Sequence, residues 1–266
     1  MPDFLTEILA PGNWPTFVFV AARVGGLMLV APLWSMTALT QTARAAIVVL
    51  LAILLLPLTP RAAVPEQIVQ VPVALAMEVL IGLAIGLTAA VIVQGVALAG
   101  EVVSLQMGLS LAPALSPMMH EQPSGVGQMQ SLLAMVIYLG VGGHLVMIQG
   151  LAYSFRLLPP GAPLALETGG GAASGLMGIL FQTGLRAAAP VMVALLLTNI
   201  AMAILSRAVP QLNTMMVALP LSIGVGLVMM GAALPFMTAS IGRWMQTLPD
   251  SVASIVQSFR ASSVGG

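Results

Sequence analysis

The sequence contains no cysteine and no lysine, and it has few charged residues of either sign. The lack of cysteine excludes disulfide bonds, thiolate metal sites and cysteine nucleophiles. Only 6% of the 266 residues are charged, and 8 basic residues balance 8 acidic ones. Because no basic stripe is present to neutralise a phosphate backbone, we expect no nucleic-acid partner.

Hydrophobic residues make up 59% of the chain, whereas soluble domains are about 45–50% apolar and about 25% charged. This composition indicates a membrane protein. No basic residue precedes Arg23, so the N-terminus lacks the positive region of a secretory signal peptide, and we interpret it as mature sequence.

Long apolar runs without polar alternation predict an all-α fold of hydrophobic helical hairpins rather than a β-barrel. We expect about six apolar helices, with proline clusters marking the loops between them. The second helix, Ala43–Leu56, is too short to cross a bilayer upright, so it is predicted to be re-entrant, tilted or buried in protein. The expected segments are Trp14–Val30, Ala43–Leu56, Val71–Leu98, Gln128–Phe155, Leu176–Leu205 and Met215–Phe236.

The C-terminal residues after Pro235 have apolar side chains at helical spacing. This pattern predicts an amphipathic surface helix. Its apolar positions are Trp244, Leu248, Val252, Ile255, Val256 and Phe259.

Catalytic motifs are missing from the sequence: we find no phosphate-binding loop, no zinc-protease motif and no nucleophile elbow. His120 and His144 have no carboxylate partner at metal-ligand spacing. We therefore expect no enzyme activity, no metal and no cofactor.

The stretch Gln106–Gly127 joins two long apolar segments and combines methionine, proline and small residues. Long connections of this kind are usually functional or disordered. One hypothesis is a conformable seal, because the Met118 and Met119 side chains adapt to irregular apolar surfaces. The other is an ordinary linker whose methionines pack on the protein itself.

Arg23 and Glu78 lie inside apolar segments, where exposure to hydrocarbon costs about 2.5–3.5 kcal/mol per charge. Each is therefore predicted to face protein or water. The two hypotheses are a proton or ion path and an ion pair between helices or subunits.

Two apolar helices joined by a short polar turn occupy Ala189–Met237, and this hairpin resembles the FliR family of export-gate proteins. The resemblance rests on the turn residues Arg207, Pro210, Gln211 and Asn213, followed by Pro220. Further similar stretches are Arg23–Gly26, Gly100–Ala114, Gly143–His144, Ser154–Phe155 and Pro159–Gly161, so the likeness covers about Trp14–Met237. The chain departs from the family pattern at Leu115–Pro117, where relatives often have Asp-Pro.

The resemblance implies a structural and gating subunit of a type III protein-export channel in the bacterial inner membrane, at the flagellar basal body. One copy would assemble with FliP-like and FliQ-like subunits, and with an FlhB-like subunit, to pass unfolded proteins. Much of the assembly would lie on the periplasmic side of the bilayer, with apolar hairpins buried between subunits. By the same resemblance, residues 1–170 are FliP-like, 171–238 form a FliQ-like hairpin, and 239–266 are the tail.

The resemblance also implies a channel plug at about 106–125, and a role for the hairpin turn in assembly. The expected plug residues are Gln106, Met107, Leu111, Pro113, Leu115, Pro117, Met118 and Met119.

Two alternatives remain open at this point. An injectisome export-gate subunit shares the hairpin pattern with its flagellar counterpart. A small-solute secondary transporter would bind its substrate where Pro190 or Pro220 interrupts a helix, although the sequence shows no inverted repeat.

Overall fold

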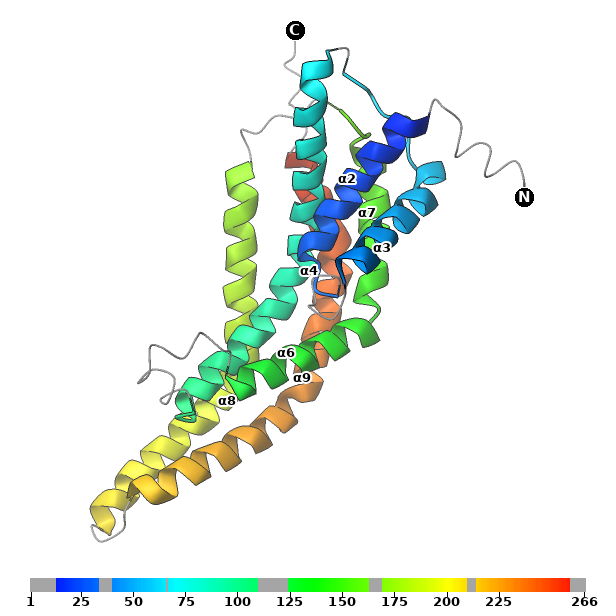
Figure 1. The fold of residues 1–266 in the computed structure, drawn as a ribbon. Helices are drawn as coiled ribbons and strands as arrows, with labels where there is room; N and C mark the ends of the chain where they lie inside the picture. Colours follow the sequence, from blue (N-terminus) through cyan, green and yellow to red (C-terminus); the bar gives the residue numbers. More distant parts are fainter. Residues whose placement is uncertain are drawn as a thin grey trace. The chain divides into compact units, whose positions relative to one another are not determined.

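The computed structural model describes residues 13–33, 40–65, 67–109, 124–162, 169–209 and 214–258, and all their regular structure is helical. This confirms the predicted all-α fold. The helices are α2 (Trp14–Val30), α3 (Gln41–Leu55), α4 (Val71–Gln106), α6 (Gly125–Gly140), α7 (Gly143–Leu157), α8 (Gly169–Ala208) and α9 (Thr214–Ser258), with 3₁₀ turns η2 (Leu56–Leu58) and η3 (Ile68–Gln70) (Figure 1).

The chain forms two compact units, each assembled from separate stretches of sequence. Unit 1 contains residues 1–91, 142–177 and 244–266, and unit 2 contains 92–141 and 178–243. Buried apolar side chains from several helices make up each core. Those of unit 1 include Val20, Val24, Ile81, Ile85, Leu151 and Phe155, and those of unit 2 include Val96, Val103, Tyr138, Leu195 and Met237.

Local side-chain chemistry sets several helix ends. Thr40 caps α3, because its hydroxyl accepts a hydrogen bond from Ala43 N at 3.3 Å. Ser124 caps α6 in the same way through Gly127 N at 2.9 Å. Gly108, with φ +79°, ends α4, and Leu109 N then bonds to Ser104 O at 3.1 Å.

The predicted single helix over Gln128–Phe155 is wrong, because the chain breaks there into α6 and α7. Gly142 lies between them with φ +78°, a conformation that glycine adopts without steric cost. Four described stretches are long and apolar enough to cross a membrane, or five if α6 and α7 form one interrupted span. One is Gln41–Leu58, which reaches 18 residues because η2 extends α3.

The C-terminal tail is not a separate helix within the described residues, because α9 runs without a break through Pro235 to Ser258. Its positions Leu248, Val252 and Val256 are buried, and Val252 would contact a side chain added at Gly150. Most of the apolar face that we predicted for a surface helix is therefore covered inside unit 1, whereas Trp244 is half-buried. Phe259 lies outside the described residues.

In unit 2, α8 and α9 lie side by side (Figure 1). Both line a cavity of about 480 Å³ near Pro190 and Phe236. Only 22% of the most apolar stretch in each helix is buried within the chain. Many large apolar side chains therefore need another apolar surface, from lipid or from protein. The exposed residues include Leu185, Val193, Leu197, Ile204, Met216 and Val228.

Candidate functional site

Glycines allow α2 and α4 to approach closely in unit 1. A side chain at Gly26 would overlap the Val79 carbonyl oxygen, and one at Gly82 would overlap the Arg23 carbonyl oxygen. Close backbone contact through small residues is typical of helix pairs in membrane proteins. The approach places Arg23 on α2 directly beside Glu78 on α4.

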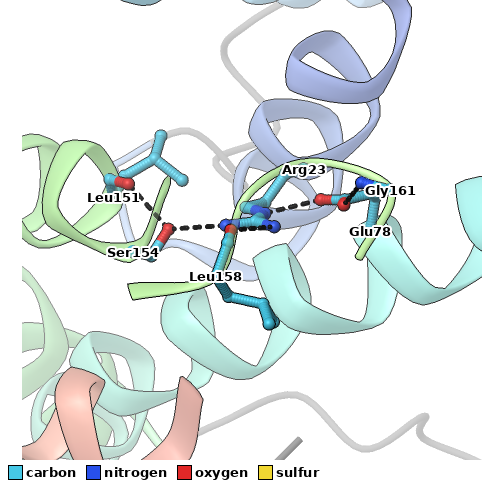
Figure 2. A network of polar contacts seen from close by, with 6 residues as sticks. All are labelled: Arg23, Glu78, Leu151, Ser154, Leu158 and Gly161. Carbon is cyan, nitrogen blue, oxygen red and sulfur yellow. Dashed lines mark hydrogen bonds and ion pairs between the residues drawn. The ribbon is translucent and has the colours of Figure 1, made fainter. Parts of the chain in front are cut away.

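Arg23 and Glu78 form a buried ion pair, with 2.6 Å between Arg23 Nε and Glu78 Oε2 and side-chain exposures of 0% and 2% (Figure 2). The other two guanidinium nitrogens donate to Ser154 Oγ and to the Leu158 carbonyl oxygen, both at 3.1 Å. Glu78 Oε1 accepts a hydrogen bond from Gly161 N at 2.9 Å. Every polar atom of the pair that can bond therefore has a partner, which is the condition for stable burial of charge.

Arg23, Glu78 and their hydrogen-bond partners all belong to unit 1. We considered a proton or ion path and an ion pair, and the structure shows an ion pair between two helices of the same chain. The Phe155 ring adds to it, because Arg23 Cζ lies 4.4 Å from the ring centroid. We call Arg23, Glu78, Ser154, Leu158 and Gly161 the unit 1 clamp. It joins α2, α4 and the end of α7.

The clamp also holds the turn after α7. Gly161 has φ +74°, and a side chain there would overlap the Ala63 carbonyl oxygen. Ala63 N donates to Pro160 O at 2.9 Å, and Ala62 N donates to Thr16 Oγ1 at 3.0 Å. The proline-rich connection after α3 is thereby fixed to the same turn.

The predicted plug lies mostly outside the described residues: Leu111, Pro113, Leu115, Pro117, Met118 and Met119 all fall there. Gln106 is half-buried as the last residue of α4. Met107 is 1% exposed, and a side chain at Gly226 on α9 would overlap its methyl carbon. Met107 therefore packs in the core of unit 2.

The two ends of this loop are both held in unit 2. At the start, Gly108 ends α4 and Met107 packs against α9. At the far end, Ser124 N donates to Glu101 Oε1 at 2.9 Å. We assigned no role to Glu101 from the sequence, although a carboxylate between a long apolar segment and a long loop was the available signal.

The hairpin turn is also only partly described. Arg207 is exposed near the end of α8, and Pro220 is exposed within α9. Pro210, Gln211 and Asn213 lie outside the described residues, as does His120. His144 lies in the first turn of α7, and the described part of the chain holds no group of three or more potential metal ligands.

Comparison with known proteins identifies the family. Residues 14–248 match the family described as bacterial export proteins, family 1. The flagellar biosynthetic protein FliR of Pectobacterium carotovorum is 30% identical over 94% of this chain and 96% of its own length. FliR of Escherichia coli K12 is 30% identical over 84% and 83%, and FliR of Bacillus subtilis is 27% identical over 82% and 85%. The chain therefore belongs to the bacterial export proteins of family 1, the FliR family.

Proposed function

We propose that this chain is a structural subunit of the flagellar protein-export apparatus and forms part of its gate in the bacterial inner membrane. The family match over residues 14–248 carries the proposal. The similar proteins are named flagellar, which favours a flagellum over an injectisome. The long apolar helices support a membrane location.

We further propose that one copy assembles with FliP-like, FliQ-like and FlhB-like subunits, and that unfolded proteins are its substrates. The exposed apolar faces of α8 and α9 support a partner-dependent fold, because a chain with so many uncovered apolar side chains gains stability from an obligate interface. The hairpin residues Arg207, Pro210, Gln211, Asn213 and Pro220 are proposed to contribute to that assembly. The FliP-like, FliQ-like and tail divisions of the sequence remain part of this proposal.

The gate itself is proposed to be the segment 110–123, together with its flanking residues. Its methionines and prolines offer apolar contacts without strong directional bonds. Such contacts exclude water and ions at rest and yield to a passing polypeptide. The role is mechanical, so we propose no catalytic chemistry and no cofactor.

The transporter alternative finds no support at the two prolines on which it depended. In the described residues α8 continues through Pro190 and α9 continues through Pro220, so neither proline interrupts its helix. Discontinuous helices are what such transporters use to bind substrate at mid-membrane.

Native mass spectrometry of the tagged chain tests the proposal. The chain is expressed with and without its neighbouring genes and purified in mild detergent. We expect a single copy inside a multi-subunit complex when the neighbours are present, and little stable protein when they are absent. A stable monomer or dimer without partners would contradict the proposal and favour the transporter.

A further inference from the structure

We propose that Glu101 is a positioning residue of the gate: it fixes the point at which the chain returns from the 110–123 segment into α6. This inference rests on the proposed gating function. We call the hydrogen bond from Ser124 N to Glu101 Oε1 the loop anchor. It joins residues 23 positions apart in the sequence, across the whole segment.

The anchor completes the first turn of α6. Ser124 Oγ accepts from Gly127 N at 2.9 Å, while Glu101 accepts from the amide of Ser124 itself. The two oxygens thus satisfy two amides that a helix start leaves without partners. A carboxylate is also favoured there by the partial positive charge of the helix N-terminus.

Two glycines permit this contact. A side chain at Gly127 would overlap Glu101 Oε1, so α6 can present its first turn to the carboxylate only because residue 127 has no Cβ. A Cβ at Gly100 would lie 2.7 Å from Gln130 Cβ and 2.9 Å from Gly127 Cα. Both distances are too short for ordinary packing. The close approach of α4 and α6 is therefore built around Glu101.

The surroundings make the anchor reversible. Glu101 is only half-buried and borders a cavity of about 420 Å³ that Gln94, Gln128 and Ser131 also line. The Arg23–Glu78 pair of the unit 1 clamp, in contrast, is buried and has a partner for each of its charged atoms. Water can solvate the Glu101 carboxylate once the bond breaks, so release costs less than opening the clamp. A reversible restraint suits a loop that a substrate must displace.

The test uses the assembled complex, reconstituted in planar lipid bilayers, and measures ion leak without substrate. Glu101→Ala removes the acceptor, and we expect the leak to rise about tenfold, the factor expected for losing one hydrogen bond to a charged group. Glu101→Gln keeps an oxygen at the same position, so its leak should lie closer to that of the natural chain. Amide hydrogen exchange at 124–128 should quicken in the alanine variant and recover in the glutamine variant.

The donor side of the anchor has a matched pair of variants. Ser124 has φ −55°, which proline adopts without strain, so Ser124→Pro removes the amide donor together with the capping hydroxyl. Ser124→Ala removes the hydroxyl alone. We expect the proline variant to leak like Glu101→Ala and the alanine variant to leak much less. Combining Glu101→Ala with Ser124→Pro should add little, because both changes break the same bond.

A chain lacking residues 111–122 is the reference, because it separates this inference from the gating proposal. If the deletion leaks while Glu101→Ala and Ser124→Pro remain as tight as the natural chain, the gate stands and the role of Glu101 is overturned. If the deletion itself does not leak, the gating proposal fails, and the positioning role fails with it. Leak in all three, with unchanged subunit composition, supports the inference.

Discussion

Replacing Glu78 by alanine is expected to remove most of the folded chain from the membrane. The change leaves the Arg23 guanidinium buried without its counter-ion, since the Arg23 side chain is 0% exposed. Breaking a buried ion pair from one side costs about 3–5 kcal/mol. It also takes the acceptor from Gly161 N, which holds the turn after α7. We expect a marked fall in the amount of full-length protein and in the melting temperature of the purified complex.

A double variant distinguishes the ion pair from a general loss of packing. Arg23→Met with Glu78→Met removes both charges and keeps apolar volume, and uncharged replacements of buried pairs are often tolerated. The double variant should therefore be more stable than Glu78→Ala, although Ser154 and Leu158 each lose a hydrogen bond from Arg23. If the double variant loses as much stability as Glu78→Ala, or more, the two charges are not coupled as we describe.

Gly26→Ala is expected to have the second largest effect on stability. The added methyl group would overlap the Val79 carbonyl, which is backbone and cannot rotate away. Helices α2 and α4 would have to move apart, which stretches the bond from Arg23 to Glu78. Overpacking of this kind costs about 1–3 kcal/mol, and we expect the upper end because the clamp is disturbed as well. Thermal unfolding of the purified complex measures the loss.

The neighbouring glycine supplies the control. A side chain at Gly25 would meet no atom within 4 Å, so Gly25→Ala tests helix propensity alone. Alanine is better than glycine in a helix by up to about 1 kcal/mol, so the variant should be as stable as the natural chain or slightly more so. Similar losses for both variants would contradict the close contact between α2 and α4.

The helices could largely be predicted from the sequence, because apolar runs and proline breaks are local signals. The Trp14–Val30 segment has the same bounds in the structure as in the prediction. The break at Gly142 was missed, since glycine is frequent throughout this chain and its left-handed conformation leaves no hydropathy signal. The continuation of α9 past Pro235 was missed because proline usually marks an end.

The candidate site was less predictable, because its contacts join distant residues. The cost of burying charge indicated that Arg23 and Glu78 need partners, but not that they pair with each other across 55 positions. The roles of Ser154 and Gly161 depend on how α7 ends beside α2 and α4. Glu101 acts through a backbone amide, a partner that no side-chain motif reveals.

Ion conductance of the complex without residues 111–122 tests the central claim most directly. The complex is purified with its partner subunits, its composition is checked, and current is measured across a planar bilayer without substrate. Our account predicts an intact complex that leaks ions steadily, whereas the complex with the natural chain stays closed. An intact complex with unchanged conductance would contradict the claim that this segment closes the channel.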